Sequence, residues 1–281
     1  MRFTKLFFFL GLIVFFAVTG YSETDVQKGT RIAKMYDDMP SFEYVRATIN
    51  LQIYDKEGKI RFFKNMMMAS HTENPGTPNK VEKFIAYFTK PADDMGSSLL
   101  FINRSGKPGE KYIYLRSIRK VKSITGSDKK LSFFGSDYTN SEVSMPEFLD
   151  FTYRYLRDDV AIFKGKEIEC FVVECLPRSP QVKNNLGYGE KILYFEKKSF
   201  INLKAEYYDE NMVKWKETKL ISFITKNNAR NQRVYYVTCT EMHDLKTGTK
   251  SRISFSDFLF EDDAKIDHDI FTIEYLTQKW W

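Results

Sequence analysis

Strict alternation of apolar and polar residues at positions 45–53 is the feature that most constrains the fold of this chain. Every second position there holds an apolar side chain: Val45, Ala47, Ile49, Leu51 and Ile53. Successive side chains of a strand point to opposite faces, so the pattern predicts a β-strand with one apolar face that another element must cover. A turn signal at residues 55–58 follows, and the alternation resumes at Ile60, Phe62, Met66 and Met68. The two runs are predicted to form a hairpin.

The same signals recur along the chain. Further strands are predicted at residues 81–88, 98–102, 111–115, 148–156, 167–176, 191–195, 203–208, 214–225, 233–240 and 250–258. Many short strands separated by turns are typical of a sandwich, a barrel or one strongly curved sheet, and the pattern alone leaves these alternatives open. Residues 71–80 are predicted to be a polar loop.

One amphipathic helix is predicted at residues 24–39, where Pro40 ends it. Its apolar face is expected to hold Val26, Ile32, Met35, Tyr36 and Met39. A short helix is expected near the C-terminus, at residues 271–276.

The first 22 residues have the three parts of a secretory signal peptide. Arg2 and Lys5 precede an uncharged run at residues 6–18, and small residues occupy the positions read by a signal peptidase. We expect cleavage after Ser22, because the run is shorter than the roughly 20 apolar residues that span a bilayer. An uncleaved anchor is the alternative. Residues 23–281 are then expected to be one exported domain, with two cations fewer than the whole chain.

Composition and motifs exclude several functions. An apolar content of 43%, with 25 Phe and 17 Tyr, excludes global disorder. The net charge of +6 is small and spread along the chain, which argues against nucleic acid as a partner. No phosphate loop, dinucleotide fingerprint, paired-His motif or nucleophile elbow is present. We therefore expect no enzyme, cofactor or metal site. A secreted hydrolase is the minor alternative, although His71, His243 and His268 are expected to be surface residues.

The three cysteines do not form a disulfide framework. Cys170 and Cys175 lie on one predicted strand and point to opposite faces, so they cannot bridge each other. Either could pair with Cys239, but the favoured interpretation is that all three are small buried apolar residues.

A basic stretch follows the strand at residues 111–115. Its cations are Arg116, Arg119, Lys120 and Lys122. They are typical of a solvated sheet edge, and they could also contact anionic headgroups or an acidic partner. Composition favours the solvated edge.

The run from Lys111 to Tyr138 resembles the signature of outer membrane lipoprotein-sorting proteins of the LolA-like superfamily. Two parts of it carry the likeness: the basic stretch at residues 120–124, and Ser132-Phe133-Phe134-Gly135-Ser136-Asp137-Tyr138. Residues 88–93, 203–209 and 269–276 are also similar to segments of that family. Ser117 departs from the usual proline, and Asn140-Ser141 from the usual aromatic and acidic pair.

This resemblance implies a mainly β fold, an incomplete and strongly curved antiparallel β barrel with an α-helical lid. It implies a periplasmic carrier that holds acyl chains of lipoproteins or lipids and sorts them towards the outer membrane. A non-catalytic accessory protein of an RND- or MMPL-type transporter is the alternative, and peripheral membrane contact is expected.

Two groups of residues are expected to serve this function. The hypothetical cavity lining is Val45, Ile49, Leu51, Ile53, Phe62, Met66, Met68 and Phe84, although the methionines could equally pack in the core. The family motif residues are Arg119, Lys120, Lys122, Phe133, Phe134, Gly135, Ser136 and Asp137.

Overall fold

A computed structural model describes residues 23–280 except 76, 78 and 145–147. These residues form one antiparallel sheet of 13 strands in the order β6-β5-β4-β3-β2-β1-β13-β12-β11-β10-β9-β8-β7. The strands are β1 (Tyr44–Tyr54), β2 (Ile60–Glu73), β3 (Val81–Lys90), β4 (Ser98–Arg104), β5 (Glu110–Leu115), β6 (Lys120–Ser123), β7 (Phe151–Phe163), β8 (Lys166–Pro177), β9 (Glu190–Glu196), β10 (Asn202–Tyr208), β11 (Lys214–Asn227), β12 (Arg233–Asp244) and β13 (Lys250–Phe260). The predicted signal peptide lies outside the described residues.

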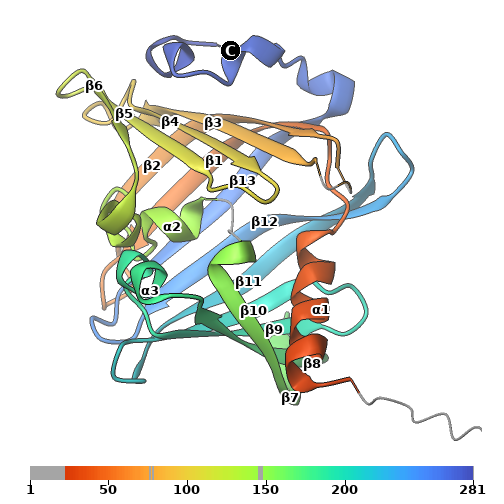
Figure 1. Cartoon of the computed structure of the whole chain (residues 1–281). Helices are drawn as coiled ribbons and strands as arrows, with labels where there is room; N and C mark the ends of the chain where they lie inside the picture. Colours follow the sequence, from red (N-terminus) through yellow and green to blue (C-terminus); the bar gives the residue numbers. More distant parts are fainter. Residues whose placement is uncertain (1–22, 76, 78, 145–147, 281) are drawn as a thin grey trace, which may run out of the picture.

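The sheet is strongly curved and does not close, because β6 and β7 end it without pairing to each other. The prediction of an incomplete β barrel is therefore confirmed. In the described residues, three α-helices accompany the sheet: α1 (Asp25–Asp37), α2 (Asn140–Val143) and α3 (Pro180–Leu186). Figure 1 shows α2 and α3 on the concave side and α1 beside β7 and β8.

The first hairpin follows the predicted pattern. Along β1, buried residues alternate with half-buried ones over the whole strand. Its register with β2 places Ile49 opposite Met66 and Ala47 opposite Met68, and all four side chains are buried. The alternation thus identified both the strand and its core-facing side.

The loop predicted at residues 71–80 begins later than expected, because β2 continues to Glu73. His71 is therefore a buried strand residue, and its prediction as a surface residue is wrong. Its ring stacks on Tyr44, with 4.4 Å between ring centroids, and meets His268 edge-on at 4.9 Å. Burial lowers the pKa of His71. The aromatic contacts explain why an imidazole is accommodated here.

The two faces of the sheet carry separate apolar clusters. The largest lies on the concave face and contains residues of β1, β2 and the β7–β9 region, together with Ile32 and Ala33 of α1. On the outer face of the other half, Ile270, Phe271 and Leu276 pack on Ile85 and Leu100. The expected C-terminal helix is present as 3₁₀ turns at His268–Ile270 and Glu274–Thr277. Figure 1 shows this C-terminal segment outside the sheet, over β3 and β4.

The cysteines behave as small apolar residues. Cys170 and Cys175 belong to clusters on opposite faces of β8, as predicted. All three cysteines are free and buried, and burial raises the pKa of the Cys175 thiol to about 12. The alternative pairing with Cys239 is not formed.

Helix α1 approaches the sheet more closely than its predicted apolar face suggests. Thr24 caps it with a capping box, and Gly29, Ile32 and Ala33 are buried. Two residues predicted on the apolar face are exposed, Val26 at 55% and Met35 at 41%. The contact face is rotated because a side chain at Gly29 has no room. A Cβ there would lie 2.6 Å from the carbonyl carbon of Arg154 in β7.

We expect Gly29→Ala to destabilise the protein by about 1–3 kcal/mol, because the added methyl group meets backbone rather than a movable side chain. In an open helix the same change would stabilise by about 1 kcal/mol, so the sign of the effect reports the contact. Urea unfolding measures it. Thr30→Ala, on the exposed face of α1, is the matched control and should be neutral or stabilising. Gly29→Ala as stable as the control would contradict this packing.

Candidate functional site

A cavity of about 370 Å³ lies on the concave side, where α1 and α3 meet the β7–β10 region of the sheet. Its walls combine residues of the helices, of the segment around α2 and of strands β3, β5, β7, β9, β10 and β12. The residues lining it include Ala33, Tyr36, Asp37, Lys80, Glu82, Lys111, Lys129, Ser141, Glu142, Phe148, Asp150, Phe151, Tyr153, Leu186, Tyr188, Lys191, Leu193, Phe195 and Tyr207. This volume is in the range of small-molecule sites, about 300–1,000 Å³.

Aromatic rings form most of the inner wall. Tyr36 of α1 packs on Phe195 of β9, with 5.3 Å between centroids. Phe148 stacks on Tyr153 at 4.8 Å, and other rings of the wall meet edge-on. Burial raises the pKa of Tyr36, so its hydroxyl stays neutral at physiological pH. The aromatic part of the wall is therefore apolar apart from neutral hydroxyls, and charged residues of the lining stand beside it.

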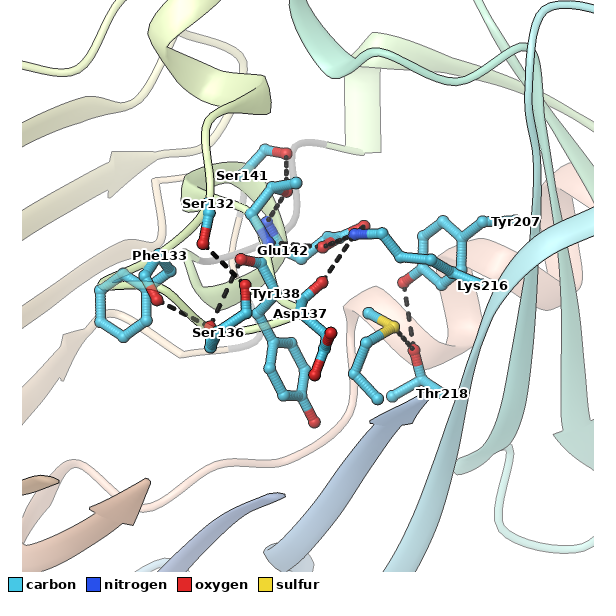
Figure 2. Close-up of polar contacts among 12 residues, drawn as sticks. Ser132, Phe133, Ser136, Asp137, Tyr138, Ser141, Glu142, Tyr207, Lys216 and Thr218 are labelled. Carbon is cyan, nitrogen blue, oxygen red and sulfur yellow. Dashed lines mark hydrogen bonds and ion pairs between the residues drawn. The ribbon is translucent and has the colours of Figure 1, made fainter. Parts of the chain in front are cut away.

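One side of the cavity is lined by Lys129, Ser141, Glu142 and Ser144, which belong to the loop that carries the family motif. We call residues 126–144 the motif loop; it contains α2 and Phe133 to Asp137. Figure 2 shows how polar contacts hold it together and tie it to the sheet. Ser132 Oγ donates to the main-chain oxygen of Ser136 at 2.7 Å, and Ser136 Oγ donates to that of Phe133 at 2.7 Å. Gly135, at φ +80°, provides the left-handed turn within this segment.

Asp137 joins the motif loop to the strands behind it. Its carboxylate accepts hydrogen bonds from Thr249 Oγ1 and Ser251 Oγ, each at 2.6 Å. Its main-chain oxygen accepts from Lys216 Nζ of β11 at 2.7 Å. The loop is thus fastened to both β13 and β11, on the concave face of the sheet.

The strongest of these contacts is a buried ion pair. Lys216 Nζ lies 3.1 Å from the Glu142 carboxylate, and the side chains are only 3% and 5% exposed. Glu142 also accepts from the Thr139 amide at 2.6 Å, as half of a capping box at the start of α2. Because Glu142 lines the cavity, this pair holds one wall in place.

The two parts of the family motif lie in different settings. Phe133 is buried, and Phe134 packs on Phe88 of β3, with 4.2 Å between centroids. The basic residues Arg119, Lys120 and Lys122 instead lie on or beside β6, the exposed edge strand of the sheet. The prediction had grouped them as one loop, but they are separate in the fold.

The hypothetical lining residues, which lie on β1, β2 and β3, do not line this cavity. Most of that set is buried in the concave core: Val45, Ile49, Leu51, Ile53, Met66 and Met68. Phe62 is 55% exposed, and Phe84 stacks on Phe101 of β4 at 5.4 Å. Their role in binding stays a prediction.

Sequence analysis missed the residues of the aromatic wall. One signal for them was available, the alternation of Lys191, Leu193 and Phe195 along β9. That pattern places all three on one face, but it does not say that α1 leaves space in front of them.

Removing the Lys216 ammonium should destabilise the fold by about 3–5 kcal/mol, because Glu142 is then buried without a countercharge. We propose urea unfolding of Lys216→Met. Lys214→Met is the matched control on the same strand; its side chain is 29% exposed, so its loss should cost about 1 kcal/mol or less. Adding Glu142→Gln to Lys216→Met should restore part of the stability. Equal losses for the two single variants would contradict this assignment.

No helix in the described part of the chain is long and apolar enough to cross a membrane.

Comparison with known proteins identifies a matching family model and solved structures of similar fold. A family model described as an uncharacterized protein matches residues 80–278, whereas no curated protein matches the sequence. An outer membrane lipoprotein-sorting protein domain from Vibrio parahaemolyticus is similar in structure, with a TM-score of 0.75 and 20% identity over 90% of this chain and 100% of that one. A DUF1329 family protein from Desulfovibrio piger has the same score and identity, over 90% and 99% of the chains.

A LolA superfamily protein from Nitrosomonas europaea is similar with a TM-score of 0.60 and 17% identity, over 88% of this chain and 98% of that one. These likenesses extend over nearly the whole of each solved structure, and the family model covers most of this chain. The chain therefore belongs to the family of uncharacterized proteins whose model matches residues 80–278, and its incomplete β barrel is the fold that these solved structures share.

Proposed function

We propose that this protein is a non-catalytic carrier that holds an acyl chain in the cavity between α1 and the concave face. The aromatic wall of that cavity is the observation that carries the proposal. Four rings provide apolar surface for a bound acyl chain: Tyr36, Phe148, Tyr153 and Phe195. They pack on one another, so no polar contact with the acyl chain is needed to hold them in place. Each buried CH₂ group contributes about 0.8 kcal/mol, so a chain can be bound by its length alone.

The cavity walls suit a carrier that has to load and release its cargo. The motif loop is fastened by a buried ion pair, whereas the ion pairs of α1 lie on its exposed surface, as between Arg31 and Glu23. Apolar contacts and the close approach at Gly29 hold α1 on the sheet. We therefore propose that α1 is the wall that moves when an acyl chain enters.

The wider role follows from the fold and from the N-terminal sequence. The lipoprotein-sorting name of the Vibrio structure supports lipoproteins or lipids as cargo, and the signal-peptide pattern supports export to the periplasm or cell envelope. In this role the protein moves acyl chains towards the outer membrane. A transporter of the RND or MMPL type is the candidate partner.

Tryptophan reporters can locate the bound chain. Phe148→Trp puts a fluorophore in the aromatic wall, and Phe84→Trp puts one in the predicted lining of the other half; both phenylalanines are half-buried. A brominated fatty acid quenches only fluorophores that it contacts. After subtraction of the wild-type signal, we expect saturable quenching of Phe148→Trp and little quenching of Phe84→Trp.

The reverse result would place the acyl chain at the predicted lining on β1, β2 and β3. Quenching of neither reporter would contradict the carrier function. Unchanged thermal unfolding of both variants is the control, since each exchanges one aromatic ring for another.

The basic edge beside β6 is the proposed contact with a membrane. Ile118 and Val121 are exposed there at 48% and 38%, among the cations of the strand. Such cations contribute about 1 kcal/mol each near an anionic bilayer surface.

Reversing Arg119, Lys120 and Lys122 to glutamate should weaken binding to anionic phospholipid vesicles at least about tenfold in a flotation assay, since three contributions of this size are lost. Charge of either sign protects a sheet edge against aggregation, so a monomeric variant separates the two roles. Undiminished vesicle binding by the variant would show that these residues form a solvated sheet edge and do not contact the membrane.

A further inference from the structure

Lys191 occupies a position on β9 where the sheet pattern calls for an apolar residue. It shares the concave face with Leu193 and Phe195, which belong to the large apolar cluster. The register places it opposite Cys175 of β8 and Tyr207 of β10, both of them buried. The side chain lines the cavity. A cation has thus been placed inside the aromatic wall.

Among the residues that the structure describes, none forms an ion pair with the ammonium of Lys191. Its Nζ lies 4.5 Å from the ring centroid of Phe151, a cation–π contact. Within the described residues it makes no hydrogen bond or ion pair. Burial lowers the pKa of Lys191, and the nearby Cys175 thiol and Glu142 carboxylate offset this only in part. Such a group costs free energy in an apolar site unless something pairs with it.

The four carboxylates that line the cavity in the described part of the chain already have partners. Each lies near a lysine other than Lys191: Asp37 at 3.0 Å from Lys34, Glu82 at 3.2 Å from Lys80, Glu142 at 3.1 Å from Lys216 and Asp150 at 3.8 Å from Lys129. The negative charges of the wall are therefore neutralised locally. An incoming anion would find Lys191 available.

We propose that Lys191 binds the anionic headgroup of a single-chain amphiphile, a carboxylate or a phosphate monoester, whose chain lies along the aromatic wall. This rests on the proposed carrier function and names its cargo class. Charge-assisted hydrogen bonds are about twice as strong as neutral ones. A headgroup at Lys191 would supply the missing countercharge and fix the end of the chain.

The size of the cavity fits one chain. A cavity of about 150 Å³ holds a benzene molecule of six carbons. By that scale the 370 Å³ here accommodates about fifteen heavy atoms. This matches one acyl chain with a small headgroup and is too little for a diacyl lipid.

Calorimetric titration of the purified mature protein with three amphiphiles of equal chain length tests the proposal. The probes are laurate, dodecyl phosphate and the neutral dodecanol. The wild type should bind at least one anionic probe about ten- to a hundredfold more tightly than dodecanol. Laurate alone would indicate a carboxylate cargo, and dodecyl phosphate alone would indicate a phosphate.

Three variants identify the residue responsible. Lys191→Met should abolish the preference for anions and leave dodecanol affinity unchanged, and Lys191→Arg should keep the preference. Lys204→Met is the matched control: its Nζ also contacts a ring, Tyr194 at 4.8 Å, but it is paired with Glu206 at 2.7 Å. This variant should bind all probes as the wild type does.

The outcomes separate this inference from the function beneath it. Equal affinity of the wild type for all three probes, or a Lys191→Met variant that retains the preference or loses affinity for all probes alike, would overturn the role of Lys191 while leaving the carrier function in place. No binding of any probe by the wild type would overturn both. Thermal unfolding confirms that each variant is folded.

Discussion

The concave face of an open, curved sheet is the constraint on which the rest of this structure depends. A closed barrel would pair its edge strands and bury its interior with its own side chains. Here β6 and β7 remain apart, so the apolar side chains of β1, β2 and β9 need covering from elsewhere. Two segments provide it, α1 from before the first strand and the motif loop from between β6 and β7. The cavity lies where these two covers meet and neither fills the space.

The two covers are held by different physics. The motif loop is fastened by Lys216, which forms an ion pair with the Glu142 carboxylate and donates a hydrogen bond to the main-chain oxygen of Asp137. Removing one partner of such a buried pair is costly, which makes this wall rigid and specific in position. Helix α1 relies on apolar packing and on a backbone approach that only Gly29 permits. Apolar contacts are non-directional, so α1 can shift while breaking few bonds, one of which is the hydrogen bond from Lys80 Nζ to the Asp37 main-chain oxygen at 3.1 Å.

Much of the sheet was predictable from the sequence, because alternation is a local signal with a direct physical cause. The strands β1 and β2 were identified with their buried faces. The short edge strand β6 was not, because its sequence Lys-Val-Lys-Ser is exposed along its whole length and no apolar face marks it. The site was harder. Alternation tells which side chains face the interior, but the part of the interior that stays open depends on where α1 settles. The lining was therefore sought on the first hairpin, whereas the cavity lies against β7, β9 and β10.

Lys191 is a charged residue on the apolar face of β9, and both the sequence pattern and the fold are needed to interpret it. Its parity with Leu193 and Phe195 already places it on the apolar face, in conflict with the rule that such faces exclude charge. Natural sequences agree across levels of structure except where function requires otherwise, so a violation of this kind marks a position for scrutiny. The sequence could not show whether a carboxylate lay within reach. The fold answers that question, because the carboxylates of the wall have other lysines beside them and Phe151 is the group that Lys191 contacts. A bound anion would supply the countercharge that this lysine lacks on its apolar face.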